Sequence, residues 1–126
     1  MMEILIYVNP ENYHAYRQLN AIRKFVPYPR RYASTHGAFK QLYAQCLSGE
    51  TIVVFFVNDD ADMAFLEVME KDFVDTKLLV SIANGNEQWV ARAYKQKPRI
   101  VTRSYDHPEL LAMTIKGIAR QMNGVN

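Results

Sequence analysis

The sequence predicts an α/β protein made of five strand–helix units, with a parallel sheet that is covered by helices on both faces. Strand-like and helical patterns alternate along all 126 residues. Two of the strand-like runs, Ile52–Val57 and Lys77–Ile82, are nearly continuous apolar segments, which is typical of strands buried on both faces. The connections are short, and no linker divides the chain, so right-handed crossovers should place helices on both faces of one doubly wound sheet.

The predicted strands are rich in β-branched and aromatic residues and end at turn residues. They are Glu3–Val8, Arg31–Ser34, Ile52–Val57, Lys77–Ile82 and Arg99–Thr102. Five such (βα) units predict the flavodoxin-like fold, with strand order 2-1-3-4-5. Ligands of such sheets bind at the carboxyl ends of the strands, which here hold Asn9, Ser34, Asn58–Asp59, Ile82–Asn84 and Arg103.

Each predicted helix has a capping side chain and a stripe of apolar residues. The expected caps are Asn9 followed by Pro10, Ser34 or Thr35, Asp59 or Asp60, Asn86, and Asp106 with Glu109 in a capping box. The stripes expected to face the core are Tyr13, Tyr16, Leu19, Ile22 and Phe25; Phe39, Leu42, Tyr43, Cys46 and Leu47, ended by Gly49; Met63, Leu66, Met69 and Phe73; Trp89, Val90, Ala93 and Tyr94; and Leu110, Leu111, Met113, Thr114, Ile115, Ile118 and Met122.

Composition narrows the class of protein. The formal net charge of +2 is too small to indicate binding to nucleic acid or to an anionic membrane. No apolar run approaches the ~20 residues of a membrane span, and the amino terminus lacks the basic start of a signal peptide. The single cysteine, Cys46, cannot form an internal disulfide, so we expect a cytoplasmic protein.

Acidic residues gather directly after the third predicted strand. Asp59, Asp60 and Asp62 follow the apolar run, and residues 51–76 carry seven Asp/Glu and one Lys. Asp59 and Asp60 are weak candidates for a metal site, but no carboxylate ends the first strand to complete it. We therefore expect these acids to cap the helix and to interact with its dipole, without a bound metal or cofactor.

Four segments together resemble a response-regulator receiver domain, the CheY-like family, and they cover almost all of the chain. The segment "MEILIYVNPE" is similar to the first strand and turn of a receiver, and "YASTHGAFKQLYA" to its second strand and helix. The segment "AFLEVMEK" is similar to the third helix, and "VTRSYDHPELLAMTIKGIA" to the fifth strand and helix. The resemblance implies one receiver-like domain over residues 1–126.

Receivers phosphorylate themselves with groups at the carboxyl ends of their strands. An acidic pair holds a divalent metal, an aspartate accepts the phosphoryl group, and a Ser/Thr and a lysine complete the site. The resemblance places the acidic pair at Val8 and Asn9 and the acceptor at Val57 or Asn58, so the carboxylates are absent from these positions.

Two further positions of the receiver site are altered. The hydroxyl position falls on Ser81 or Ile82, and the lysine position on Arg103, which keeps the charge but not the geometry. The aromatic position of the fifth strand falls on Ile100. The resemblance thus implies a degenerate phosphoacceptor pocket made of Asn9, Val57, Asn58, Asp59, Ser81 and Arg103.

Basic and aromatic residues gather near the fourth helix and fifth strand. In receivers this region, with the fifth helix, binds partners or a second copy, and aromatic residues and Arg are frequent at such hot spots. The resemblance therefore implies an interface made of Trp89, Arg92, Tyr94, Arg99, Arg103 and Tyr105. We expect surface or capping roles for the three histidines, His14, His36 and His107, whose spacing fits no zinc site.

The function that follows is a non-enzymatic pseudo-receiver that acts through phosphorylation-independent protein–protein interaction in signal transduction. Two alternatives stay open. The domain is an unconventional receiver that is phosphorylated or metal-bound through Asp59 or Asp60, or it is a flavodoxin-like binder of a small ligand at the strand ends.

Overall fold

A computed structural model of the chain describes residues 2–46, 50–73 and 75–122. All five strands are parallel and form one sheet in the order β2-β1-β3-β4-β5, which confirms the predicted doubly wound topology. The strands are β1 (Glu3–Tyr7), β2 (Arg31–Ala33), β3 (Thr51–Val57), β4 (Lys77–Ile82) and β5 (Ile100–Arg103). The helices are α1 (Tyr16–Phe25), α2 (His36–Gln45), α3 (Asp60–Met69), α4 (Glu87–Tyr94) and α5 (Glu109–Met122).

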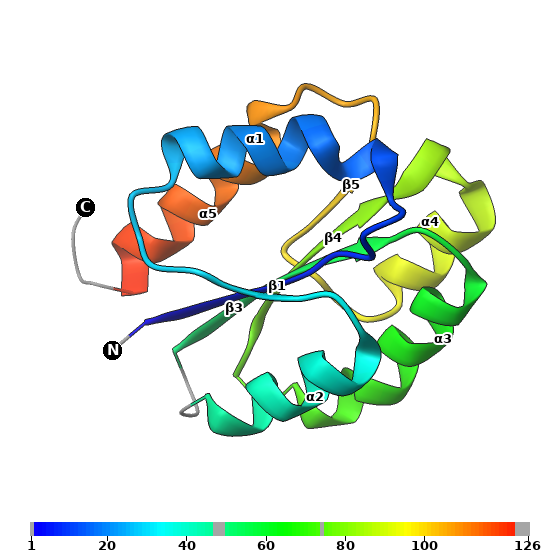
Figure 1. Ribbon diagram of the computed structural model, residues 1–126, viewed down its shortest axis with the longest axis horizontal. Coiled ribbons are helices and arrows are strands. Elements are labelled where there is room, and N and C mark those ends of the chain that lie inside the picture. The colour runs from blue at the N-terminus through cyan, green and yellow to red at the C-terminus, as the bar shows by residue number, and fades with distance from the viewer. Residues whose placement is uncertain (1, 47–49, 74, 123–126) are drawn as a thin grey trace.

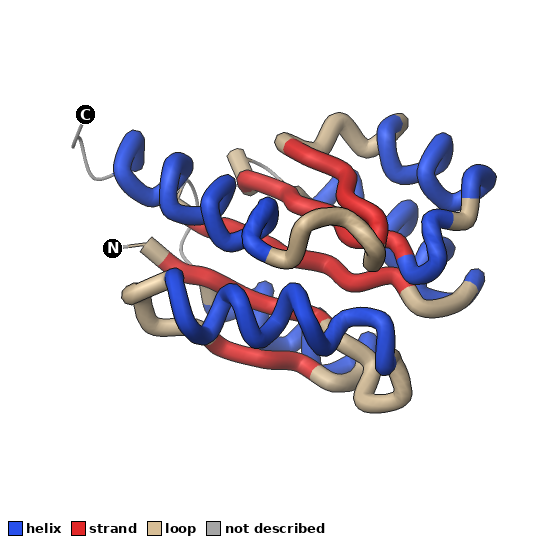
Figure 2. The backbone as a smooth tube through the Cα atoms, turned by 90° about the horizontal axis from the view of Figure 1, so that it is seen from above, coloured by secondary structure: helices blue, strands red, loops and turns tan. Residues whose placement is uncertain are grey.

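The helices form two layers around the sheet. Helices α1 and α5 lie side by side on one face, and α2, α3 and α4 cover the other (Figures 1 and 2). The central strand β3 is buried along all seven residues, because it has a strand on each side and a helical layer on each face. Side chains alternate between the two layers, so that Phe56 packs with α1 and α5, whereas Phe55 and Val57 pack with the other helices.

Strand bounds differ from the predicted ones by one residue at five of the ten ends. The first two strands end at Tyr7 and Ala33, β3 begins at Thr51, and β5 is shifted to Ile100–Arg103. The shift of β5 places Arg103 inside the strand, where it pairs in register with Ile82 of β4. Within the described residues, no helix is both long and apolar enough to cross a membrane.

The first helix begins later than predicted. The side chain of Asn9 accepts a hydrogen bond from the Glu11 amide at 2.9 Å and stabilises a turn, rather than capping a helix. A short 3-10 turn, η1 (Tyr13–Ala15), precedes α1. Tyr13 and Tyr16 are 83% and 64% exposed, so their predicted place in the core is wrong.

The buried face of α1 is formed by other residues than those tyrosines. Its members are Gln18, Leu19, Ala21 and Ile22. Polar Gln18 was not expected there, because helical spacing alone favours the aromatic residues as the inner face.

Three of the predicted caps are formed. Thr35 accepts from the Ala38 amide, Asp59 from the Asp62 amide, and Asn86 from the amides of Gln88 and Trp89. The open choices between Ser34 and Thr35, and between Asp59 and Asp60, are thereby decided.

The apolar stripes of α2 and α3 pack as predicted in the described residues. Phe39, Met63, Leu66 and Met69 are buried, while Leu42, Tyr43, Cys46 and Phe73 are half-buried against the same core. Burial raises the pKa of the Cys46 thiol, which fits a packing role. Leu47 and Gly49 lie outside the described residues.

The capping box predicted for α5 is not formed. The Asp106 carboxylate instead accepts from the Arg103 amide at 2.7 Å, and His107 Nδ1 accepts from the Glu109 amide at 3.2 Å. His107 therefore has the expected capping role.

Three apolar residues of the last two helices are turned outward. Tyr94, Leu110 and Met113 are 57%, 40% and 43% exposed, which contradicts the predicted inner stripes at these positions. The inner face of α5 uses alanines instead, with Ala112 and Ala119 completely buried.

Candidate functional site

The carboxyl edge of the sheet is closed by apolar side chains at Val57, one of the two positions, with Asn58, that the resemblance offers for the acceptor. Val57 and Ile82 are paired in register, and Ile82 is paired with Arg103, so these three residues form one row across β3, β4 and β5. Val57 and Ile82 have no exposed surface and face the α2–α4 layer. A phosphoryl group has neither an acceptor oxygen nor open space at Val57.

Ser81 is turned away from this edge. It is 2% exposed, and its hydroxyl donates to the side-chain oxygen of Gln18 on α1 at 2.5 Å. The amide nitrogen of Gln18 donates in turn to the Thr102 hydroxyl and to the Arg103 carbonyl, both at 3.2 Å. Of the two residues considered for the hydroxyl position, Ile82 shares the row of Val57, and Ser81 belongs to a buried network that joins α1 to β4 and β5.

One carboxylate oxygen of Asp59 caps α3, so only the other oxygen is free toward the strand-end pocket. Its Oδ1 accepts from the Asp62 amide at 2.8 Å. The carboxylate that turns back toward the sheet is that of Asp62, whose side chain is 2% exposed. Its Oδ2 accepts from the Asn58 amide at 2.9 Å, which fixes the end of β3 to the first turn of α3.

Two ring side chains complete the surroundings of Asp62. Its Oδ1 accepts from the Tyr7 hydroxyl at 2.7 Å and from His36 Nε2 at 2.8 Å. Since a carboxylate only accepts, the proton of this contact lies on His36 Nε2. The three residues come from β1, α2 and α3, and we call them the Tyr7–His36–Asp62 cluster.

Stacked rings hold this cluster in place. Tyr7 stacks on Phe55 at a centroid distance of 4.6 Å, and His36 stacks on Phe65 at 4.4 Å. Burial, followed by the hydrogen bond to Asp62, raises the pKa of Tyr7, so its hydroxyl stays protonated and remains a donor.

A shallow, open hollow of about 310 Å³ lies over the cluster. It is lined by Tyr7, Asn9, Ser34, Thr35, His36, Asp59, Ala61 and Asp62. In the described parts of the chain, no three His, Cys, Asp or Glu side chains are placed to hold a metal ion. Asp59 Oδ1 is engaged in the cap of α3, and both carboxylate oxygens of Asp62 accept hydrogen bonds within the fold.

A larger hollow lies at the opposite end of the strands. It has a volume of about 610 Å³ and is bordered by Met2, Tyr28, Arg30 and Arg31. Arg31 is paired with Glu3 at 3.1 Å, and Arg30 donates to the carbonyls of Val26 and Tyr28. Both arginines of this hollow are therefore engaged in contacts within the chain. In addition, ligands of doubly wound sheets bind at the other edge, at the carboxyl ends of the strands.

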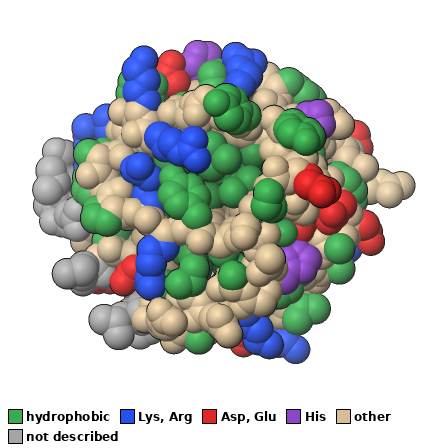
Figure 3. All heavy atoms as spheres, viewed as in Figure 1, with side chains coloured by type: hydrophobic (Ala, Val, Ile, Leu, Met, Phe, Trp, Pro, Cys, Tyr) green, Lys and Arg blue, Asp and Glu red, His purple; other side chains and the backbone are tan. Residues whose placement is uncertain are grey.

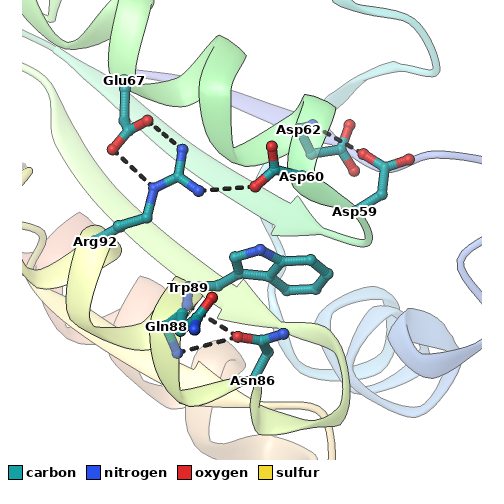
Figure 4. Close-up of polar contacts among 8 residues, drawn as sticks. All are labelled: Asp59, Asp60, Asp62, Glu67, Asn86, Gln88, Trp89 and Arg92. Atoms are coloured by element: carbon teal, nitrogen blue, oxygen red, sulfur yellow. Dashed lines mark hydrogen bonds and ion pairs between the residues drawn. The ribbon is translucent and has the colours of Figure 1, made fainter.

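The remaining acid of the run, Asp60, belongs to a contact between two helices. Arg92 of α4 donates to both carboxylate oxygens of Glu67 and, at 2.8 Å, to Asp60, both on α3 (Figure 4). These contacts raise the pKa of Arg92, and the hydrogen bonds from Arg92 lower the pKa of Glu67. Arg92, which was predicted for a partner interface, therefore has partners within the chain.

Replacing Glu67 by glutamine is expected to cost stability at neutral pH and almost none in acid. The pKa of Glu67 is lowered on folding, so its stabilising effect is complete above its ordinary value of 4.5 and is lost as the pH falls through the lowered value. Urea unfolding of wild type and E67Q should give free energies that differ at pH 7 and converge as the pH falls below about 4. A difference that stays constant with pH would contradict an ionic contribution of Glu67.

The other predicted interface residues lie around α4 and β5, and several are open to solvent. Tyr94 and Tyr105 are 57% and 65% exposed, and Arg99 is exposed as well. Arg103 is half-buried, with its guanidinium 3.9 Å from Glu87. Trp89 packs in part against the core, and its indole lies between the Asn86 cap and the Arg92 contacts (Figure 4).

Tyr105 also contributes to the fold at one point. Gly85 has a φ of +61°, and a Cβ at this position would come within 2.6 Å of the Tyr105 hydroxyl. Glycine is therefore required at position 85 for two reasons: the backbone has a positive φ there, and the Tyr105 ring packs too close to leave room for a Cβ.

Sequence reasoning missed two members of the site. The sequence predicts a surface or capping role for His36, which in the structure binds the buried carboxylate of Asp62, and it predicts Tyr7 only as a strand residue. One feature of the sequence could have indicated the buried role of Asp62: it lies three residues after the capping residue Asp59, on the inner face of the helix.

Comparison with known proteins supports the fold without a match in sequence. No protein-family model matches the chain, and no curated protein has a significantly similar sequence. Solved structures do match. A signal receiver domain from Vibrio parahaemolyticus has a TM-score of 0.70 at 10% identity, over 96% of this chain and 92% of that one.

Two further structures match to a similar degree. A pilus assembly protein from Burkholderia thailandensis has a TM-score of 0.69 at 18% identity, over 96% of this chain and 100% of that one. A response-regulator receiver domain from Rhodospirillum rubrum has a TM-score of 0.65 at 11% identity, over 98% of this chain and 95% of that one. The chain therefore has the fold of response-regulator receiver domains.

Proposed function

We propose that this chain is an atypical receiver signalling domain that acts by protein–protein interaction without being phosphorylated and without catalysis. The observation that carries the proposal is the chemistry of the strand-end row. Val57 and Ile82, each one of the two residues to which the resemblance assigns the acceptor and the hydroxyl, are buried and apolar, the other acceptor candidate Asn58 carries no carboxylate, and no acid ends β1.

The Tyr7–His36–Asp62 cluster supports the same proposal. The carboxylate of Asp62, which turns back toward the sheet, is hydrogen-bonded to Tyr7 of β1, to His36 of α2 and to the amide of Asn58, the residue after β3. An oxygen engaged in this way is a poor nucleophile and a poor ligand for Mg²⁺, because both roles require it to give up contacts inside a buried site. The cluster would hold β1, α2 and α3 in one fixed arrangement.

The surface formed by α4, β5 and the start of α5 is the proposed partner site. It exposes Tyr94, Arg99 and Tyr105 beside the half-buried Arg103. Large aromatic side chains next to arginines are frequent at the centres of protein interfaces. The internal contacts of Arg92 assign that residue a supporting role at the edge of the site.

The proposal is tested by exposing the chain to acetyl phosphate or beryllofluoride with Mg²⁺. Intact-mass measurement should find no phosphoryl adduct, and amide NMR signals of Val57 and Asn58 should not shift in a saturable manner. The expected reason is that no carboxylate lies at the acceptor position with a metal beside it.

A phosphoryl adduct that is lost in Asp59→Asn and kept in the exposed control Asp72→Asn would overturn the proposal in favour of an unconventional receiver. A small molecule that copurifies and perturbs the amides of the strand ends would favour the ligand-binding alternative instead.

A further inference from the structure

The hollow at the amino ends of β1 and β2 has the size and the walls of a site for a small molecule. Its volume of about 610 Å³ falls within the ~300–1,000 Å³ that is usual for ligand sites. Met2, Ile4, Tyr28 and Pro29 form apolar walls, and Met2 and Tyr28 also pack against the core on the α1–α5 face of the sheet. The hollow can therefore take up an apolar group.

Basic side chains accompany these apolar walls. In Figure 3, basic and hydrophobic side chains lie next to each other at the left of the view, where β1 begins in Figure 1. The main group of acidic side chains lies at the right of the same view. A ligand of this hollow would therefore meet cations as well as apolar surface.

The two arginines of the hollow differ in the charge of their partners. Arg31 is paired with the Glu3 carboxylate at 3.1 Å. Among the described residues, Arg30 donates only to neutral oxygen atoms and pairs with no carboxylate. The charged side chains that line the hollow, two arginines and one glutamate, thus sum to +1, and the charge that is left without compensation is that of Arg30.

The guanidinium of Arg30 is held in position before any ligand binds. Its Nη1 donates to the carbonyls of Val26 at 2.7 Å and Tyr28 at 3.3 Å, and its Nε donates to the Tyr32 hydroxyl at 3.2 Å. A side chain that is already ordered loses little conformational entropy on binding. The second terminal nitrogen, Nη2, has no acceptor in the described part of the chain, so its N–H groups remain for a ligand.

We infer that this hollow binds an amphipathic monocarboxylate, with the carboxylate on Arg30 and the hydrocarbon chain against Met2, Tyr28 and Pro29. A guanidinium is a strong donor to a carboxylate, and the bond is charge-assisted. A single uncompensated charge favours a monoanion, since Glu3 beside it would repel a second negative charge.

The inferred site is separate from the two surfaces discussed above. It lies at the amino ends of the strands, whereas Val57 and Asn58 lie at the carboxyl end of β3. It borders β1 and β2, which are on the opposite side of the sheet from β5 and the proposed α4–β5–α5 partner site. The inference therefore goes beyond the proposed function and does not depend on it.

The strength of binding should depend on both ends of the ligand. Each further methylene that is buried should strengthen binding about fourfold, until the chain fills the hollow. Replacing the carboxylate by a neutral amide of the same length should weaken binding about tenfold, because the charge-assisted bond to Arg30 is lost.

The experiment titrates the whole chain with hexanoate, octanoate, octanamide and octyl phosphate at pH 8 and follows the amide NMR signals. The amides of Ile4, Arg30 and Arg31 should shift in a saturable manner, and those of Val57 and Asn58 should not. Octanoate should bind more tightly than hexanoate and octanamide. It should also bind more tightly than octyl phosphate, which is largely dianionic at this pH.

Two variants and a control test the roles of the charge and of the space. Arg30→Gln should lower the affinity for octanoate to that for octanamide and leave the affinity for octanamide unchanged. Gln45→Phe, an exposed position that lines the hollow, should fill it and weaken both ligands while Arg30 is kept. Arg17→Gln is the control, because it removes an exposed cation of α1 that does not line this hollow.

Circular dichroism of each variant restricts the comparison to folded protein. The inference is overturned if octanoate gives no saturable shift up to about 10 mM, which would mean no meaningful affinity. Equal weakening of octanoate and octanamide in Arg30→Gln, or loss of binding in Arg17→Gln, would also contradict it, as would tighter binding of octyl phosphate. Saturable shifts at Val57 and Asn58 in place of Ile4 and Arg30 would move the ligand to the carboxyl edge and overturn the assignment of this hollow.

Discussion

Asp62→Ala should lower the free energy of unfolding by about 3–5 kcal/mol, the usual cost of removing one partner of a buried charged contact. The change leaves the Tyr7 hydroxyl, His36 Nε2 and the Asn58 amide without their acceptor. Buried donors without partners carry the full cost of their lost hydration. The loss should be the largest that a polar substitution produces at the carboxyl edge of the sheet.

Asp60→Ala is the matched control, because Asp60 lies two residues away in the same turn and its side chain is 75% exposed. Chemical unfolding should place its cost below about 1 kcal/mol. Asp62→Asn, which keeps the shape, should fall between the two variants. Equal losses for D60A and D62A would show that the Tyr7–His36–Asp62 cluster contributes no stability.

Gln18→Leu should cost about 2–4 kcal/mol, although it replaces a polar core residue by an apolar one of similar size. Gln18 is fully buried and holds the hydroxyls of Ser81 and Thr102 and the Arg103 carbonyl. Leucine would leave these polar groups buried and unpaired. Asn20→Leu, on the exposed side of the same helix, should change stability by less than about 0.5 kcal/mol.

A second substitution distinguishes lost hydrogen bonds from poor packing. When Ser81 is changed to alanine in the Gln18→Leu background, part of the loss should be regained, because one unpaired hydroxyl is removed. Urea unfolding of the two single variants and the double variant measures this coupling. Strictly additive losses would mean that the Gln18 network does not act as a unit.

The fold was predictable because its determinants are local and repeated. The apolar runs of β3 and β4 and the capping residues Thr35, Asp59 and Asn86 each act within a few residues, and all are found in the structure as predicted. The parallel sheet follows from the alternation of strands and helices, since parallel neighbours require crossovers, and the order 2-1-3-4-5 is that of flavodoxin-like folds with five units.

The site was less predictable because its contacts are distant in sequence. Tyr7 meets Asp62 across 55 positions, and Ser81 meets Gln18 across 63. Periodicity gives the face of a helix but not the partner that it meets, so polar Gln18 was given no inner role and Tyr16 was placed inside. The lack of a carboxylate at Val57 and Asn58 can be read from the sequence. The acid considered for reaching back toward the sheet is Asp59, whereas the carboxylate that turns back is that of Asp62.

The position of Trp89 also gives the protein a built-in optical reporter. It is the only tryptophan of the chain, and its half-buried ring lies between the start of α3 and the Asn86 cap of α4 (Figure 4). Its emission will follow the polarity around α3 and α4, next to the α4–β5–α5 surface. Binding of a partner near α3 and α4 can therefore be followed by intrinsic fluorescence without a label, while α1 packs on the other face of the sheet.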